Sequence, residues 1–495
     1  MGVPLERDEG EYAYIAQQLL QGVLPYTESH SMKFPGIFLV YAIILTIFGQ
    51  TSVAIHLSLL LVNLATAFLL FLLGRNVLNL SAGIVAGISF CVLSLSPALQ
   101  GNWANSEHFV LLFAIGGVLL LRKVHDQPVQ YLLSGFLLGF ALLIKQHAIF
   151  FCLFGAIYLF YKVVVQQIKK PRLVIGLFAV GGMAPMILSA LFYKITGNFS
   201  DFWFCTFQYP SEYISLVSMD QGFKNFKYFF GQILESNFPI LLLALLGLAS
   251  VGWRKDVRQE YIFLIGFFVC SFFAVTPGFY FRPHYFLLWM PAFSLFAGIG
   301  FESLRLSNIK KVISMGILTI ILGVPILSKM HFFFILPVAE LTRSVYGRNP
   351  FPESLEIAKY IRDHSEKDDS VAIFGSEPQI LFYANRKSAT RHIYMYPLGE
   401  QHSHASLMQK EMALEIQVSR PEFIVLVNIP TSWLFKKNSE TLLLDWAKGY
   451  VPKWYDISGV VDIIPHKGTT YLWGEQLKEY SAQANRHLVI YKKRA

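Results

Sequence analysis

Charged residues are scarce in this sequence. Asp, Glu, Lys and Arg together make up 15% of its 495 residues, whereas an average soluble domain has about 25%. Hydrophobic residues make up 54% of the chain, and the mean hydropathy is +0.47. These values exclude an ordinary soluble protein and favour a chain that lies largely within a lipid bilayer.

Cysteine is also rare, with four residues in the chain. Three of them fall inside apolar runs and Cys205 stands alone in a predicted loop, so neither a disulfide framework nor a C-x-x-C metal spacing is present. Internal repeats, a G-x-G-x-x-G fingerprint and a P-loop are absent as well. We therefore predict no metal ligands and identify no cofactor, although the sequence does not decide whether a divalent metal is needed.

Long hydrophobic runs are what the chain has in abundance. Runs of about 17–25 apolar residues have the length of membrane-spanning helices. We expect about ten spans, several of them short for a hydrocarbon core of about 30 Å, at residues 52–74, 81–99, 107–121, 131–144, 147–163, 173–195, 238–252, 261–276, 284–302 and 312–335. The sequence thus predicts a polytopic α-helical membrane bundle.

The basic residues between these spans predict an orientation, because cytoplasmic loops carry an excess of Lys and Arg. One set of alternate loops holds thirteen, namely Arg75, Arg122, Lys123, Lys162, Lys169, Lys170, Arg172, Arg254, Lys255, Arg258, Arg305, Lys310 and Lys311. The other set holds six, namely Arg7, Lys33, Lys145, Lys224, Lys227 and Arg282. We therefore expect residues 1–51, 196–237, about 277–283 and everything after about Leu336 to be extracytoplasmic. The net charge of +9 is then mainly a topology signal, and no nucleic-acid partner is expected.

The first extracytoplasmic segment, residues 1–51, has no signal peptide before it. We expect an additional helix upstream that carries the chain across the membrane. Residues 35–48 are apolar but short and close to the next span. They predict an interfacial helix along the membrane surface, with a re-entrant or tilted span as the alternative.

The composition changes at about Pro337, where long apolar runs stop and charges appear throughout. Helical spacing in residues 352–369 alternates with short strand patterns at 370–375, 422–427 and 487–493. The sequence therefore predicts two parts: a transmembrane domain over residues 1–336 and an extracytoplasmic α/β domain over residues 337–495.

Carboxylates gather on the predicted outer side. Asp8, Glu9 and Glu11 precede Tyr12 near the start of the chain, and Glu107 with His108 begins a span. A carboxylate at such a place can act as a general base. The structural alternative is that acidic residues favour the first turn of a helix.

Cations gather on the same predicted side. Lys33 precedes an apolar run, Lys145 interrupts one, and Arg282 stands close to His284 and Tyr285. Ionisable groups near a bilayer are unfavourable unless they are solvated or functional. Each has a structural alternative: snorkelling for Lys33, a turn between short helices for Lys145, and an aromatic belt around Arg282. Their common location favours a shared site.

These motifs resemble those of the GT-C superfamily of membrane glycosyltransferases, most closely the protein O-mannosyltransferase and ArnT-like group. The resemblance covers about residues 5–335. It is carried by the order of Asp8-Glu9-Gly10-Glu11-Tyr12, Lys33-Phe34-Pro35, Phe48-Gly49, Leu143-Ile144-Lys145-Gln146 and Arg282-x-His284-Tyr285 with Pro291. It implies a polyprenyl-phosphate-linked sugar donor and an inverting transfer, with Asp8 catalytic, Lys33 near the donor phosphate and Tyr285 in the pocket.

The full set of expected roles follows from this chemistry. Phosphate is a good leaving group, so the developing charge needs cations rather than a general acid, and the acceptor hydroxyl needs a base. We expect Asp8 and Glu9 to be catalytic. The donor phosphate is assigned to Lys33, Lys145, Arg282 and His284, and the pocket to Tyr12, Glu107, His108 and Tyr285.

The predicted partners are a polyprenyl-phosphate sugar, membrane lipid, and a glycan, lipid or protein acceptor, at the plasma or inner membrane. A transporter or lipid-linked-sugar flippase is the main alternative, although the missing repeats speak against it. A scaffold that presents the outer domain and a ligase that uses a pyrophosphate-linked donor are further alternatives.

Overall fold

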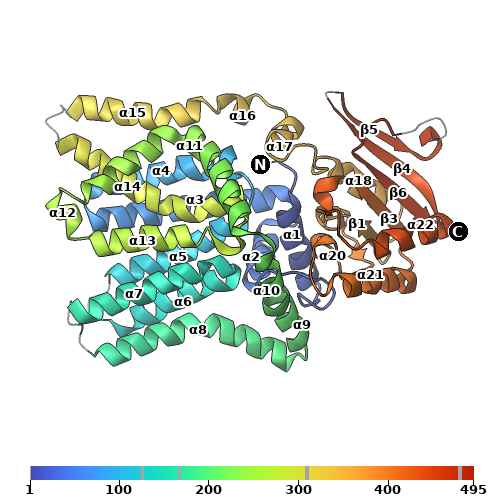
Figure 1. Ribbon diagram of the computed structural model, residues 1–495, viewed down its shortest axis with the longest axis horizontal. Helices are drawn as coiled ribbons and strands as arrows, with labels where there is room; N and C mark the ends of the chain where they lie inside the picture. The colour runs from blue at the N-terminus through green and yellow to red at the C-terminus, as the bar shows by residue number, and fades with distance from the viewer. Residues whose placement is uncertain are drawn as a thin grey trace.

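The computed structural model of the protein describes residues 2–123, 127–165, 168, 170–306, 311–465, 467–477 and 482–494. A bundle of long helices lies beside a smaller domain that contains a sheet (Figure 1). The two helices α1 (Arg7–Leu20) and α2 (Pro35–Phe48) lie between these parts. The N-terminal segment is therefore placed where the two parts meet.

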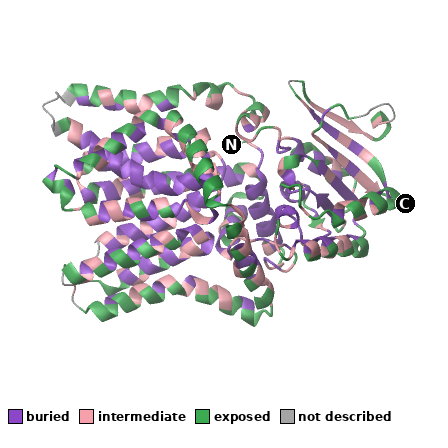
Figure 2. Cartoon of the chain, viewed as in Figure 1, coloured by how far each residue is buried: buried purple, intermediate pink, exposed green. Residues whose placement is uncertain are grey.

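The bundle is built from apolar helices. They are α3 (Ser52–Val77), α4 (Leu80–Ser94), α5 (Ser106–Lys123), α6 (Pro128–Ile144), α7 (Ile149–Val165), α8 (Pro171–Ile195), α11 (Met219–Ser250), α13 (Tyr261–Phe273), α14 (Met290–Leu306) and α15 (Lys311–Leu327). Among the described residues, five helical stretches are long and apolar enough to cross a membrane. Large apolar side chains such as Phe68 and Leu188 are exposed on the outer helices, while the middle of the bundle is buried (Figure 2). The protein is a multi-pass membrane protein, as predicted.

Several helix boundaries differ from the prediction, and two of them differ most. α11 begins at Met219, well inside the segment expected as a loop, and the helix bends at Asn237, whose backbone is non-helical. Pro239 explains the bend, because proline lacks the N–H that would continue the helical hydrogen bonds. The long apolar run begins only after this bend, so hydropathy indicated only the second half of the helix. The last bundle helix ends at Leu327 and not at residue 335.

The rest of the predicted outer loop 196–237 is also largely helical. It contains α9 (Phe199–Trp203), a π-helical turn (Phe204–Gln208) and α10 (Tyr209–Tyr213). Aromatic stacking holds this segment, with the Tyr193 and Phe202 rings 4.7 Å apart between centroids. Of the basic residues used for the orientation, Lys169 and Lys310 lie outside the described residues.

The smaller domain contains a mixed sheet with the strand order β2-β1-β3-β6-β4-β5. Its strands are β1 (Ser370–Phe374), β2 (Lys387–Ser388), β3 (Phe423–Asn428), β4 (Tyr455–Ile464), β5 (Gly468–Trp473) and β6 (His487–Lys493). β1 pairs in parallel with β2 and β3, whereas β6 is antiparallel to β3 and β4. The predicted strands at 370–375, 422–427 and 487–493 correspond to β1, β3 and β6.

Helices surround this sheet. They are α17 (Val338–Tyr346), α18 (Glu353–Asp363), α19 (Gln379–Ala384), α20 (Tyr396–Gly399), α21 (Ala405–Ser419) and α22 (Leu442–Trp454), with the short α16 (Met330–Phe334) leading in from the bundle. The prediction of a helical membrane bundle joined to a C-terminal α/β region is confirmed.

The N-terminal helix α1 fixes the smaller domain to the bundle. Gly10 lies so close to α19 that a β-carbon at this position would be 2.7 Å from the backbone nitrogen of Gln379. The buried Arg7 Nη2 lies 2.6 Å from Glu377 Oε1, and the backbone N–H of Leu5 donates to the Tyr383 hydroxyl at 2.8 Å. Each residue of α1 is thereby held in a defined direction, including the acidic ones.

Candidate active site

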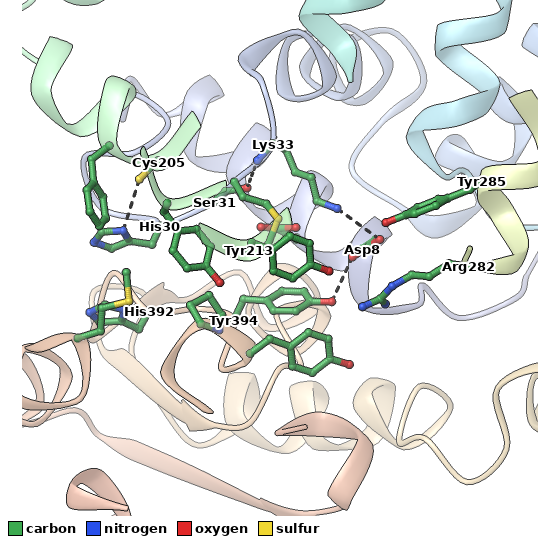
Figure 3. A pocket seen from close by; sticks show the side chains of 17 residues that line it. Asp8, His30, Ser31, Lys33, Cys205, Tyr213, Arg282, Tyr285, His392 and Tyr394 are labelled. Atoms are coloured by element: carbon green, nitrogen blue, oxygen red, sulfur yellow. Dashed lines mark hydrogen bonds and ion pairs between the residues drawn. The ribbon is translucent and has the colours of Figure 1, made fainter. Parts of the chain in front are cut away.

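Asp8 lies in the first turn of α1, at the junction of the bundle and the smaller domain. Glu6 and Glu9 form a reciprocal capping box that starts the helix, and the free N–H groups of this turn favour a carboxylate. Asp8 Oδ2 lies 3.6 Å from Lys33 Nζ, and Oδ1 accepts a hydrogen bond from the Tyr394 hydroxyl at 3.1 Å (Figure 3).

The surroundings of Asp8 keep it ionised. Burial by itself would raise the pKa of Asp8, but the positive charges of Lys33 and Arg282 hold that pKa well below its usual value. The group is therefore a carboxylate at neutral pH, as a general base must be.

The other acids of the motif point in different directions. Residues three or four positions apart share a face of a helix, so Glu11 lies on the face of Asp8 whereas Glu9 does not. Glu11 lines the same cavity as Asp8. Glu9 Oε1 instead lies 3.0 Å from His56 Nε2 and accepts from the Ala104 N–H. The structure thus uses Glu9, expected to be catalytic, to attach α1 to the bundle.

Glu11 has a pKa far from the usual value of a glutamate. Burial raises the pKa of Glu11 to about 7, although Lys33 opposes this shift; Asp8 adds to it. Near neutral pH this carboxyl is therefore divided between its neutral and charged forms, beside a cation and a permanent carboxylate.

Two of the predicted phosphate ligands face Asp8. Lys33 precedes α2, and Arg282 precedes the turn Pro283–Trp289 that leads into α14. Both line the cavity that contains Asp8, and Tyr285 lines it as well. Lys33 and Arg282 are the cations that an incoming anion at this cavity would meet.

The other two predicted phosphate ligands are occupied differently. Lys145 ends α6 and forms a buried ion pair with Glu107, with its ammonium 4.5 Å from the centre of the Tyr285 ring. His284 Nδ1 lies 2.8 Å from Gln100 Oε1, and its Nε2 lies 3.9 Å from Glu107. Lys145 and Glu107 do not line the two cavities described here, so their ion pair supports the wall behind Tyr285.

The remaining predicted pocket residues are buried in the core. The Tyr12 ring packs against Tyr41 with centroids 5.4 Å apart, and Lys33 lies 5.6 Å from its centre. His108 Nδ1 lies 2.8 Å from Asn63 Oδ1 on α3. Neither side chain lines the two cavities, so both shape the site from behind.

Asp8 stands between two cavities. The smaller has a volume of about 70 Å³ and includes Lys33, Tyr209, Tyr213 and Tyr285. The larger, of about 780 Å³, is lined by polar and aromatic side chains that include Gln100, Gln232, His284 and Tyr346. The two cavities share Asp8, Arg282, Tyr394 and Tyr396. A carboxylate and a guanidinium therefore face both spaces.

The smaller domain supplies residues that the sequence reasoning missed. Tyr394 comes from the segment between β2 and α20, and Tyr396 begins α20; the same segment places His392 in the smaller cavity. The aromatic run in "HIYMYP" (392–397) is the feature that could have indicated them. Tyr209 and Tyr213 reach the cavity from α10.

Comparison with known proteins places this geometry in context. Residues 29–198 match the family described as dolichyl-phosphate-mannose-protein mannosyltransferase. The structure is similar to ArnT from Cupriavidus metallidurans bound to undecaprenyl phosphate, with a TM-score of 0.59 and 13% identity, over 99% of this chain and 94% of that one. Part of the chain matches this family, and the whole chain has the fold of the ArnT membrane glycosyltransferase. The predicted resemblance is confirmed.

A second solved structure supports the same fold. The oligosaccharyltransferase of Archaeoglobus fulgidus, tethered with an acceptor peptide that contains the NVT sequon, is similar with a TM-score of 0.51 and 12% identity. The similarity covers 96% of this chain and 70% of that one. No curated protein matches the sequence. The family match and the two similar structures support the enzyme prediction over the transporter and scaffold alternatives.

Proposed function

We propose that this glycosyltransferase moves a sugar from a polyprenyl-phosphate carrier to an acceptor hydroxyl, with inversion at the anomeric carbon, on the extracytoplasmic side of the membrane. The observation that carries the proposal is the position of Asp8 between two cavities, with Lys33 on one side of it and Arg282 facing both. A base and two cations are the groups that this reaction needs.

The sizes of the cavities support a division of labour. The smaller cavity, at about 70 Å³, lies well below the range of about 300–1,000 Å³ that is usual for ligand pockets, so it suits a small group such as a phosphate better than a sugar. The larger, at about 780 Å³, lies within the range of about 300–1,000 Å³ that is usual for ligand pockets. We assign the donor phosphate to the smaller cavity and the sugar with its acceptor to the larger one.

The reaction then follows from the groups in place. Asp8 takes the proton of the acceptor hydroxyl as its oxygen attacks the anomeric carbon. The bond between that carbon and the phosphate oxygen breaks, and the electron pair leaves with the phosphate. Lys33 and Arg282 stabilise the charge that develops there, so no general acid is required. Attack from the face opposite the phosphate inverts the anomeric centre.

The lipid carrier fits both the membrane and the comparisons. The long tail of a polyprenyl chain stays in the bilayer and places its phosphate at the depth of the lipid headgroups. The similar ArnT structure is bound to undecaprenyl phosphate. The proposal extends that lipid-phosphate chemistry to this chain, with a glycan, lipid or protein as the acceptor.

The direct test is transfer from radiolabelled polyprenyl-phosphate sugars in membranes that contain the protein, followed by identification of the labelled product. Asp8→Asn should reduce turnover by about 10²- to 10⁴-fold, since this is the usual contribution of a general base. Asp445→Asn, on the exposed surface of α22, is the matched control and should retain activity. Near-normal turnover of a folded Asp8→Asn protein would remove Asp8 from the mechanism.

The proposed location is the plasma or inner membrane, with the site on the extracytoplasmic side. A cysteine at position 448, exposed on α22, should react with a membrane-impermeant maleimide in intact cells. Arg258→Cys, exposed on the short helix α12 (Lys255–Arg258) at the end of the bundle away from the smaller domain (Figure 1), should react only after the cells are opened. The reverse pattern would place the site in the cytoplasm.

A further inference from the structure

A cluster of three metal-ligand side chains lies at the far end of the smaller cavity from Asp8. We propose that His30, His392 and Glu411 bind a divalent transition metal, with Zn²⁺ the best match, and that this ion attaches the loop of Lys33 to the C-terminal domain. One ligand atom from each of the three residues lies within 4.8 Å of the other two. The metal site itself is independent of the proposed function, and only its effect on Lys33 rests on that function.

The three side chains come from separate parts of the chain. His30 lies in the loop between α1 and α2, His392 lies between β2 and α20, and Glu411 lies on α21. His392 Nε2 is 3.0 Å from Glu411 Oε2, and His30 Nε2 is 4.0 Å from the same oxygen. The two imidazole rings are stacked, with centroids 4.8 Å apart (Figure 3).

These distances are close to those of an occupied site. Zinc binds His nitrogen and carboxylate oxygen at about 2.0–2.2 Å, which puts neighbouring ligand atoms of a tetrahedron about 3.4 Å apart. Only a small contraction of the cluster would therefore be needed. Two His and one Glu are a known zinc ligand set, in which the fourth position is left to water. Imidazole ligands favour zinc and its neighbours over Mg²⁺ or Ca²⁺.

The unpaired nitrogen of His30 is the second observation that points to a ligand. His30 Nε2 is buried and has no hydrogen-bond partner among the described residues, which is unfavourable for a polar atom. It faces Glu411 and His392. A metal ion at this point would satisfy it.

Neighbouring groups hold the candidate ligands in place, as is usual around metal sites. Cys205 Sγ lies 3.4 Å from His30 Nδ1, on the side of the ring away from Glu411. The other carboxylate oxygen of Glu411 accepts from Arg391 at 3.4 Å, and the Arg391 carbonyl accepts from the His30 N–H at 2.7 Å. The alternative use of the cluster is a simple hydrogen bond between His392 and Glu411.

The position of the cluster indicates a structural role for the metal. Only Ser31 and Met32 separate His30 from Lys33 in the same loop. Both His30 and His392 line the cavity that contains Lys33. The other two ligands belong to the C-terminal domain. A bound ion would therefore fix the distance between the proposed phosphate-binding lysine and that domain.

Metal content of the purified full-length protein tests the proposal. The protein should be prepared in detergent without a polyhistidine tag, and its zinc measured by mass spectrometry. We expect one equivalent of zinc that a strong chelator removes. After removal, Co²⁺ should give the visible absorption bands of a four-coordinate site, and added Zn²⁺ should raise the melting temperature whereas Mg²⁺ should not.

Variants separate this site from chance binding. His392→Ala and Glu411→Gln should lower bound metal at least tenfold and abolish the Co²⁺ bands. His404→Ala is the matched control, because its imidazole also contacts a carboxylate, Glu212, at 3.3 Å, and it should retain the metal.

Three results would overturn the proposal. One is wild-type protein without zinc and without Co²⁺ bands, and this measurement decides even where a variant fails to fold. Another is a folded double variant of His30 and His392 that binds as much metal as the wild type. The last is an equal loss of metal in His404→Ala.

Discussion

Lys33 illustrates how a single charge at the membrane surface acquires a defined partner. A lysine before an apolar run could extend to the lipid headgroups, but here its ammonium lies 3.6 Å from Asp8 and lines the same cavity. Burial alone would lower the pKa of Lys33, yet Asp8 and the neighbouring tyrosines hold that pKa well above its usual value. Lys33 is therefore a permanent cation.

Lys33→Ala should weaken donor binding more than it slows turnover. A hydrogen bond to a charged group contributes about 1.5–3 kcal/mol, which corresponds to a rise in the KM for the donor of about 10- to 150-fold. The comparison of KM and kcat with wild type measures this. Lys224→Ala, on the exposed start of α11, is the control. An unchanged donor KM in Lys33→Ala would show that the lysine contacts the lipid headgroups and does not bind the donor.

Glu11 should make donor binding depend on pH. Its pKa of about 7 lies above the usual value, so the carboxyl is neutral below pH 7 and becomes negative as the pH rises. A second negative charge beside Lys33 opposes binding of the donor phosphate. The KM for the donor should therefore rise between pH 6 and pH 8, by up to about tenfold for a coupling of one pKa unit.

The variant Glu11→Gln isolates this effect, because it keeps the shape of the side chain without its charge. Its KM should be flat over the same pH range, and equal to the wild-type value at the lower end. Asp8 stays charged throughout because its pKa lies far below this window. If Glu11→Gln keeps the full pH dependence, another group is responsible.

At the scale of elements, α1 is the part on which the site depends. It presents Asp8 and Glu11 on one face, uses Glu9 to contact the bundle, and packs against α19 through Gly10. A shift of this helix would move the Asp8 carboxylate, the proposed base, away from Lys33. The close packing of Gly10 against α19 therefore helps to set the position of Asp8.

Gly10→Ala should separate α1 from α19. The added β-carbon would lie 2.7 Å from the backbone nitrogen of Gln379, a contact that a side-chain rotation cannot relieve. Overpacking of this kind destabilises by about 1–3 kcal/mol, so the melting temperature in detergent should fall together with activity. Gly231→Ala, a helical glycine with open space around it, should leave both unchanged. Equal behaviour of the two variants would contradict the packing argument.

Hydrophobic periodicity indicated the helices well and their ends less well. Spans such as 173–195 agree with α8 because the apolar run and the helix coincide. α11 was underestimated because its first half is polar and is separated from the second by the bend before Pro239. The sheet strands β1, β3 and β6 were indicated by short apolar runs, whereas β4 and β5 have partly polar, partly exposed faces that blur the pattern.

At the scale of the whole molecule, the buried pair of Arg7 and Glu377 joins the bundle to the domain. Both side chains are largely shielded from water. Glu377→Ala would leave Arg7 buried without its anion, which destabilises by about 3–5 kcal/mol. We expect a lower melting temperature and faster proteolysis between bundle and domain. Asp445→Ala, which removes an exposed ion pair, should change neither, and identical proteolysis of both variants would argue against this role of the pair.

The candidate site was only partly visible in the sequence. Asp8, Lys33 and Arg282 could be predicted because ionisable residues near a bilayer are unfavourable unless they are solvated or functional, and these three were expected at the same membrane face. The ion pair of Lys145 with Glu107 could not be predicted, since the sequence does not show which charges on different helices are in contact. The contribution of Tyr394 depends on how a separate domain docks, which no local pattern encodes.

That tyrosine has a consequence for how such enzymes diversify. The hydroxyl of Tyr394 reaches from one domain to the carboxylate of the other. Exchanging the C-terminal domain for that of a relative would replace part of the environment of Asp8, the proposed base, along with any surface that selects the acceptor. New specificities should therefore arise by gradual substitution of residues where the bundle and the C-terminal domain meet. Exchange of the whole C-terminal domain should give inactive hybrids.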